Sequence, residues 1–524
     1  MNARAKRGIA VRTALAGLAL SAMIGGALGG CAVLAPSYDP VLPAVDPQVA
    51  VELAYSRESY LEARDALFSA RPASVEAWWT RYDDPALTAI VEAALEGNRT
   101  VAQASANVRA ARALLNLSEK EYIPTDAQEL SYQRVGFSQT NPFGIPDQTL
   151  LDASIGALWE LDLFGRIERT IEVAEADLAQ GEALLADIQS LVAADTAGAY
   201  LEMRGLEAQM RVVRENIDSL AQTVELTIII RDAGRGTDLD VERAREQLAS
   251  TQSLLPPLEA ARDAALYRLG VLAGMTPPEV GARLAEGPAL PRLGGGFDVG
   301  APEALLRRRP DILAAEFALV EANATIGLRR SEAFPVVGFL GSFGLTAAEE
   351  GRIFNSDAVN FATGPALSFS AAEFVRAQDR VEAARAGAEA QLATYEQAVL
   401  VALAEVETAL ALNRALRAQV RALEESRRAA NEAAALARIR FENGATTFLT
   451  VLDAERRAIE ARTAVAQVRT SIALSEVDIF RTLRAGPSGF GAGSAAGGAA
   501  GGVVSGAAGG ATVAAAGEPA DTSP

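Results

Sequence analysis

The sequence predicts a mixed α and β chain built by internal duplication, each half carrying two short strands followed by a long helical hairpin. Three observations predict this fold: blocks that match at a nearly constant spacing, two proline-free heptad seams, and four alternating segments of about 10 residues. Aromatic residues make up only 6% of the 524 residues. This composition favours long helices over a β-sandwich or a nucleotide-binding sheet.

The duplication is visible as two aligned blocks. Residues 98–124 match residues 309–335 at an offset of 211, and a second block follows at an offset of 210. The matched pairs are Val101 with Ile312, Ala104 with Ala315, Ala111 with Ala322, Leu117 with Leu328, Pro124 with Pro335, Trp159 with Phe369, Phe164 with Phe374, Arg166 with Arg376, Gly234 with Gly444, and Leu239 with Leu449. We therefore expect a first repeat over 76–297 and a second over 298–485.

The first residues have the pattern of a secretion signal. A basic stretch over 1–12 precedes an apolar run over 13–28, and small residues then lead to Cys31, the only cysteine. This pattern predicts a lipoprotein signal peptide over 1–30, lipidation of Cys31, and a lipid-anchored extension over 31–75. The alternative is an ordinary cleavage site beside a cysteine placed by chance. Ala32, where an aspartate would favour inner-membrane retention, favours the outer membrane.

Two long helices carry the strongest local signal. Over 167–232 and 376–441, apolar residues recur at steps of three and four, and no proline interrupts either stretch. Each helix would be about 100 Å long, which exceeds any single globular core. The helices returning from them are expected over 238–272 and 448–484. Within the first of these, Pro256 and Pro257 predict a bend or a break.

Four segments alternate in the manner of strands, over 125–135, 150–160, 336–346 and 359–369. Their length matches a tilted transmembrane strand. Two hairpins leave open edges and cannot close a barrel alone, whereas three chains would supply twelve strands. The alternative is a small four-stranded sheet in a soluble domain. The tail over 486–524 is rich in Gly and Ala, and we expect it to be disordered.

Composition excludes several function classes. The formal charge is -19, and removing Arg4, Lys6, Arg7 and Arg12 with the signal leaves 44 basic against 67 acidic residues, or -23. This balance argues against nucleic acid as a partner. With no histidine and one cysteine, the sequence also predicts no metal site, no cofactor and no disulfide framework.

Several motifs together resemble one known family. They are WELDLFGR at 159–166, RRPDI at 308–312, DDPAL at 83–87, and GATTFLTVLDAER at 444–456. Over about residues 36–485 the chain is similar to outer-membrane factor lipoproteins of RND-type tripartite efflux systems, the NodT group of TolC-like outer membrane efflux proteins. The chain departs from the family in lacking a proline before Phe369 and in an insertion at 49–74, for which we expect only a helix before Trp78.

The resemblance implies a trimer with a twelve-stranded β-barrel continuous with a twelve-helix coiled-coil tunnel in the periplasm. It implies a bacterial outer-membrane location and partners comprising a periplasmic adaptor (membrane fusion protein) and an inner-membrane RND-type transporter. The duct would conduct substrates passively, and no enzyme activity is expected.

The periplasmic helix tips are the expected gate. Leu449 and Asp453 share a helix face and match family positions that narrow the pore. Asp238 and Asp240 follow the other turn, where Asp238 either caps the helix or faces the pore. The residues expected to contact the adaptor are Gly234, Gly236, Gly444 and Ala445, although turn geometry alone also explains the glycines.

Other polar and aromatic residues have structural interpretations. The basic run Arg307, Arg308 and Arg309 is expected to be a solvated or ion-paired helix end. We interpret Trp159, Phe164 and Phe374 as aromatics at the barrel edge or packing at its junction with the helices.

Two alternative functions compete with the exit duct. A periplasmic adaptor or coiled-coil scaffold lipoprotein would share the anchor, but it would have one hairpin instead of two. A lipoprotein enzyme would need a phosphate loop, a nucleophile elbow or metal-ligand spacing, and the sequence contains none of these motifs.

Overall fold

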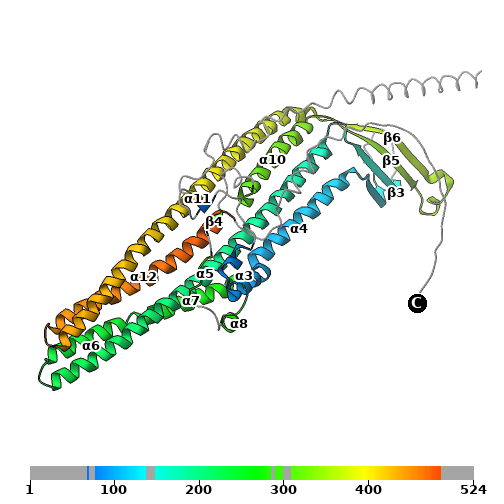
Figure 1. Cartoon of the computed structure of the whole chain (residues 1–524). Coiled ribbons are helices and arrows are strands. Elements are labelled where there is room, and N and C mark those ends of the chain that lie inside the picture. The colour runs from blue at the N-terminus through cyan, green and yellow to red at the C-terminus, as the bar shows by residue number, and fades with distance from the viewer. Residues whose placement is uncertain are drawn as a thin grey trace, which may run out of the picture.

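The computed structural model describes residues 68–69, 77–136, 148–284, 290–294, 296–298 and 308–484. Within them the molecule is elongated, with long helices running side by side and a sheet at one end (Figure 1). At the other end lie the tips, the turns at 233–237 and 443–447 that join each very long helix to the helix returning from it. The predicted signal peptide 1–30, Cys31, Arg307 and residues 137–147 and 486–524 lie outside the described residues.

The first half contains one very long helix and several shorter ones. Its helices are α3 (Pro85–Gly97), α4 (Arg99–Glu119), α5 (Arg166–Asp232), α6 (Asp238–Gln252), α7 (Leu255–Ala273) and α8 (Pro277–Arg283). α5 has 67 residues and spans about 100 Å. Asp84 begins α3, where its carboxylate accepts hydrogen bonds from the backbone N–H groups of Ala86 and Leu87.

The second half repeats this plan with fewer breaks. Its described helices are α10 (Pro310–Ser331), α11 (Ala371–Glu442) and α12 (Phe448–Thr482). α11 has 72 residues and begins five residues before the predicted boundary at 376, because the Ser370 side chain caps it by accepting from the N–H of Glu373.

The proline pair breaks the returning helix of the first half. A single helix over 238–272, bent or broken at Pro256 and Pro257, is predicted, and the structure shows a break between α6 and α7. α7 begins at Leu255, so Pro256 lies in its first turn. N–H groups in the first turn of a helix have no intrahelical acceptor, so a proline there loses no hydrogen bond and destabilises the helix little.

The main sheet has four antiparallel strands, β2 (Thr125–Val135), β3 (Gln148–Leu161), β5 (Val336–Ala347) and β6 (Val359–Ser368), in the order β2-β3-β5-β6. A second pair, β1 (Phe68–Ser69) and β4 (Phe297–Asp298), is parallel. In the insertion 49–74, where a helix is expected before Trp78, the structure describes only Phe68 and Ser69, which form a strand. Short 3-10 helices cover Trp78–Tyr82, Lys120–Tyr122, Glu350–Arg352 and Ser356–Ala358.

The largest apolar core lies midway along the helices. Trp78 is fully buried there and stacks on Phe480 of α12, with ring centroids 4.5 Å apart. The Tyr200 hydroxyl of α5 donates to the carboxylate of Asp84 at 2.7 Å. This core joins the start of the first half to the end of the second.

Candidate functional sites at the two ends of the molecule

The sheet has one apolar face. Its register places Gln128, Ile155, Phe343 and Phe361 in one row across the four strands, and Trp159 lies opposite Phe339. Because side chains on directly paired residues point to the same side, the apolar faces predicted for separate segments form one surface. The other face is mainly polar or small, with Ser131, Asp152 and Thr346 in one row and Glu129, Ser154, Gly344 and Asn360 in another, and it has one apolar pair, Leu158 with Leu340.

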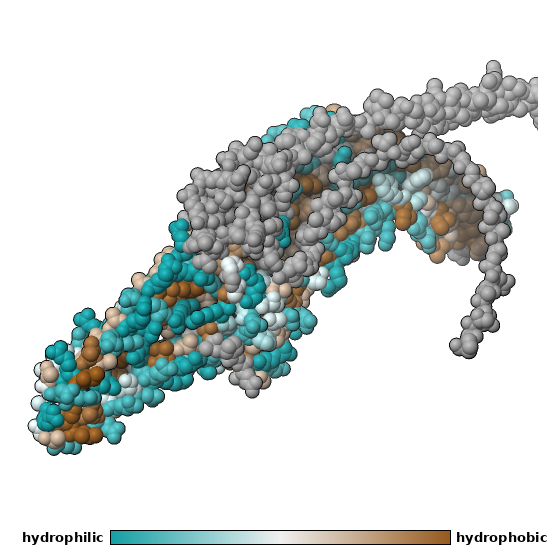
Figure 2. Space-filling model, viewed as in Figure 1, coloured by the Kyte–Doolittle hydropathy of each residue, from teal (hydrophilic) through white to brown (hydrophobic). Residues whose placement is uncertain are grey.

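The described residues leave most of the apolar face uncovered, although Ile353 and Ala358 pack against Leu151, Ala153 and Leu345 at one end of it. Phe361 is 76% exposed and Leu130 is 79% exposed, and several other large apolar side chains of the sheet are exposed as well. A continuous exposed patch of this kind indicates contact with lipid or protein. Figure 2 shows apolar residues over part of the sheet and at the helix tips, whereas the long helices between them are mainly hydrophilic in this view.

The sheet also has two open edges. Among the described strands, β2 pairs only with β3, and β6 pairs only with β5. The outer backbone N–H and C=O groups of β2 and β6 are therefore available to another chain. Long unpaired edges are a liability unless another strand covers them.

Aromatic and charged side chains join the sheet to the helices. The Trp159 indole N–H donates to the carbonyl of Tyr122 at 3.1 Å, and Phe164 stacks on Phe334 with ring centroids 4.9 Å apart. These contacts agree with packing at the strand-to-helix junction. Phe374, the repeat partner of Phe164, is half exposed instead.

The two turns at the other end have the same geometry. Gly234 and Gly444 have φ values of 72° and 74°, and in each turn the next residue donates its N–H back to a carbonyl of the last helical turn. Ala445, for example, donates to Arg440 at 2.7 Å. Left-handed residues that end helices in this way are usually glycine, so turn geometry alone accounts for both. At Gly236 a Cβ would lie 3.2 Å from the backbone nitrogen of Arg231.

The two predicted acids of the first tip differ in role. Asp240 closes a capping box, because its carboxylate accepts from the Thr237 N–H at 3.2 Å and the Thr237 hydroxyl at 2.7 Å. Asp238 is almost fully exposed and accepts a long hydrogen bond from Arg231 at 3.4 Å. Thr237 therefore caps the helix with Asp240 as its capping-box partner, while Asp238 is the first helical residue and remains open to solvent.

Leu449 and Asp453 lie together on one side of α12. Leu449 is 55% exposed, whereas neighbouring Val451 is buried against the other helices. Asp453 accepts from Arg456 and Arg457, each at 3.0 Å. These hydrogen bonds, the one from Arg456 foremost, hold the pKa of Asp453 below its usual value, so it carries a full negative charge at neutral pH.

A buried polar contact joins the two helical hairpins between the tips and the middle of the helices. Glu455 of α12 accepts from Arg438 of α11 at 2.6 Å and from the hydroxyl of Thr223 of α5 at 3.3 Å. Glu455 and Thr223 are both buried. Because α5 belongs to the first hairpin and the other two helices to the second, this contact ties the hairpins to each other.

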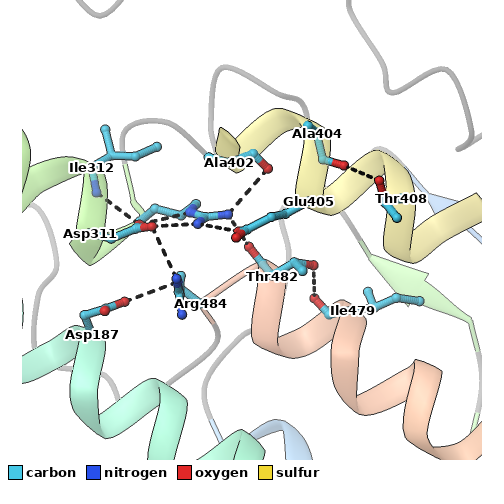
Figure 3. Close-up of polar contacts among 11 residues, drawn as sticks. Asp187, Asp311, Ile312, Ala402, Ala404, Glu405, Thr408, Ile479, Thr482 and Arg484 are labelled. Atoms are coloured by element: carbon cyan, nitrogen blue, oxygen red, sulfur yellow. Dashed lines mark hydrogen bonds and ion pairs between the residues drawn. The ribbon is translucent and has the colours of Figure 1, made fainter. Parts of the chain in front are cut away.

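A second charged cluster lies at mid-length, where α5, α10, α11 and α12 meet (Figure 3). Arg309, 1% exposed, donates twice to Asp311 at 3.0 and 2.6 Å, to Glu405 at 2.9 Å and to the Thr482 carbonyl at 2.7 Å. Arg484 pairs with Asp187 at 3.2 Å and with Asp311 at 3.5 Å. The basic run at 307–309 is predicted to be either solvated or ion-paired, and Arg309 is ion-paired in the structure.

The cluster keeps its central acid ionised. Burial alone would raise the pKa of Asp311, but the hydrogen bonds and charge of Arg309 outweigh it, and the pKa lies below its usual value. The contacts from Asp187, Glu405 and Arg484 are not predictable from the residues around Arg309.

No helix in the described part of the chain is both long enough and apolar enough to cross a membrane. Among the same residues, no group of three or more Asp, Glu, Cys or His side chains is arranged to hold a metal ion.

The chain matches a family model and several curated relatives. The model described as "Outer membrane efflux protein" matches residues 90–275 and 301–483. Outer membrane protein OprJ of Pseudomonas aeruginosa is 30% identical over 423 residues, which cover 78% of this chain and 86% of OprJ. Nodulation protein T of Rhizobium leguminosarum bv. trifolii is 27% identical over 429 residues, covering 82% and 89% of the two chains.

Solved structures share the fold. The outer-membrane channel OprN superposes with a TM-score of 0.77 at 33% identity, covering 82% of this chain and 97% of OprN. The MtrE outer membrane channel of Neisseria gonorrhoeae, solved in its open state, superposes with a TM-score of 0.70 at 25% identity, covering 83% and 96%.

Proposed function

The chain belongs to the outer membrane efflux protein family and serves as an outer-membrane component of an efflux system, and from that premise we propose that three copies form a passive exit duct. In this proposal a twelve-stranded β-barrel crosses the outer membrane and continues into a periplasmic tunnel of twelve coiled-coil helices. The repeats 76–297 and 298–485 are then two copies of one unit, each supplying a strand pair and a helical hairpin.

The observation that carries the proposal is a sheet with one apolar face and two open edges. β6 of one copy would pair with β2 of the next, so that every edge is covered. Lipid would cover exposed side chains such as Phe361 and Leu130. Two copies would form an eight-stranded barrel, whose interior is filled by side chains. Three copies would form a twelve-stranded barrel, which leaves room for a channel.

The long helices also have unpaired apolar side chains. Leu400, Val401 and Leu412 of α11 are each more than 40% exposed in the single chain. Apolar residues exposed along a coiled-coil helix support contact with a further helix, and neighbouring copies would supply it.

The tips are the proposed gate. Threefold symmetry would bring three copies of Leu449 and Asp453 together at the pore axis, with Asp238 as a second acidic position. Asp240 is the weaker candidate, because its carboxylate is engaged by Thr237. Ionised carboxylates facing one another repel, so cations or partner contacts would shift the balance between closed and open states.

The partners follow from the same proposal. The turns at Gly234, Gly236, Gly444 and Ala445 would receive a periplasmic adaptor, which links the duct to an inner-membrane RND-type transporter. Lipidation of Cys31 would anchor the chain to the outer membrane. The alternative of an adaptor or scaffold lipoprotein is less well supported, because this chain has two helical hairpins and a four-stranded sheet.

The decisive experiment compares the full chain with its Cys31→Ser variant. We expect both to remain in the outer-membrane fraction until detergent is added, to have the mass of three copies by native mass spectrometry, and to form channels in planar bilayers. An adaptor without its lipid would instead become water-soluble. A compact soluble monomer that forms no channel would refute the duct.

A further inference from the structure

A polar cleft lies between the two helical hairpins, above the tips. It has a volume of about 330 Å³ and is lined by residues of α5, α11 and α12. A cavity needs only roughly 10–15 Å³ to admit one water molecule. The cleft is therefore large enough for a small ligand together with its waters.

Arg462 of α12 brings an unbalanced positive charge to this cleft. Its guanidinium donates to the side-chain oxygens of Asn431 at 2.8 Å and Asn216 at 3.2 Å. Both acceptors are neutral amides, and no ion pair joins this guanidinium to a described carboxylate. Partly buried charges in proteins are normally paired with an opposite charge.

Asn216 of α5 is also among the lining residues of this cleft and has an unused donor. Its side chain is fully buried, and its Oδ1 faces Arg462. That contact fixes the orientation of the amide, because a guanidinium can only donate. The Nδ2 group is then left without a hydrogen-bond partner among the described residues, which is uncommon for a buried amide.

The remaining charges of the cleft cancel. Arg438 and Glu455 also line it, and they pair with each other at 2.6 Å. With two guanidinium groups and one carboxylate among the lining residues, the net charge of the lining is +1, in a chain whose formal charge is -19.

We propose that this cleft binds a small monovalent anion, a halide or a short carboxylate, between the Arg462 guanidinium and Nδ2 of Asn216. Water would satisfy the amide but leave the guanidinium without a counter-ion, and a cation would meet two groups that only donate. Since Asn216 lies on the first hairpin and Arg462 on the second, the bound anion links the hairpins. The site goes beyond passive conduction and lies within one chain, so its failure would leave the exit duct untouched.

The test is crystallographic and uses bromide as the probe. Crystals of the full chain in detergent, soaked in sodium bromide, should show an anomalous peak within about 3.5 Å of both groups. Excess sodium formate should then displace the bromide if carboxylates share the site, while a persisting peak assigns it to halides. No peak in the cleft, with bromide visible elsewhere, would overturn the proposal.

Variants separate the site from general charge effects. Arg462→Gln should lose the peak, and Asn216→Asp should lose it too, because its carboxylate takes the place of the anion and pairs with Arg462. Asn216→Asp is close to isosteric and serves if Arg462→Gln fails to fold. The matched control Arg421→Gln removes an exposed charge from α11 and should keep the peak. Bromide that persists in Arg462→Gln, or disappears from Arg421→Gln, would contradict the assignment.

Discussion

Replacing Arg309 with alanine should destabilise the protein far more than removing other arginines of the same helix region. The guanidinium is 1% exposed and makes ion pairs with Asp311 and Glu405 and a hydrogen bond to the Thr482 carbonyl. Its loss would remove the shortest contact from a guanidinium to Asp311, which keeps Arg484 at 3.5 Å, and would take a donor from Glu405 and from the Thr482 carbonyl. Breaking a buried ion pair from one side costs about 3–5 kcal/mol.

The matched control is Arg329→Ala on α10. Arg329 is 42% exposed and pairs with Glu332 at 2.6 Å, and exposed pairs of this kind contribute only about 0.2–1 kcal/mol. At roughly 2 °C per kcal/mol for a large chain, Arg309→Ala should melt about 6–10 °C below the parent, and the control within about 2 °C.

The assay is the loss of the helical circular dichroism signal on heating, measured in detergent at one heating rate, because unfolding of such assemblies is often irreversible. Adding Asp311→Asn to Arg309→Ala should recover part of the loss, since it removes one of the carboxylates that lost a donor. Equal melting temperatures for Arg309→Ala and Arg329→Ala would refute the claim that the buried cluster stabilises the junction.

Three further predictions address the gate, pH dependence and helix packing. Asp453→Ala should raise single-channel conductance in planar bilayers, and unchanged conductance would remove Asp453 from the constriction. Burial, opposed by Arg417, raises the pKa of Glu476 from 4.5 to about 7; its contribution to stability is therefore present below about pH 4.5 and lost as the pH rises through 7. In Glu476→Gln the fall in thermal stability between pH 5 and pH 8 should be smaller by at most about 3 kcal/mol, and an identical pH profile would contradict this. Gly205→Ala should cost about 1–3 kcal/mol in the same melting assay, because its Cβ would overlap Thr470; Thr470→Ala should restore part of it, and no effect of Gly205→Ala would show that the helices separate easily.

The periodic parts of the fold are the parts that the sequence predicts well. The seam over 167–232 predicts α5, observed as Arg166–Asp232, and alternation predicts that Ile155, Phe343 and Phe361 lie on apolar strand faces. These features depend on spacing along the chain, which a single sequence contains.

Features that depend on contacts between distant segments were not predictable in this way. Arg309 and Thr482 are 173 positions apart, so nothing near RRPDI indicates a buried cluster. The cleft at Arg462 likewise needs Asn216, 246 positions away. The role of Asp240, in contrast, is predictable from the sequence alone. Thr237 lies three residues before it, and this is the spacing of a capping box.

The open edges of the sheet have a genetic consequence. If three subunits must share strands to close one barrel, a subunit with a defective β2 or β6 edge spoils every assembly it enters. In a cell that makes sound and defective subunits in equal amounts, only about one assembly in eight would be free of the defect, assuming random mixing. Edge mutations should therefore behave as dominant-negative alleles, whereas mutations that merely prevent synthesis should be recessive.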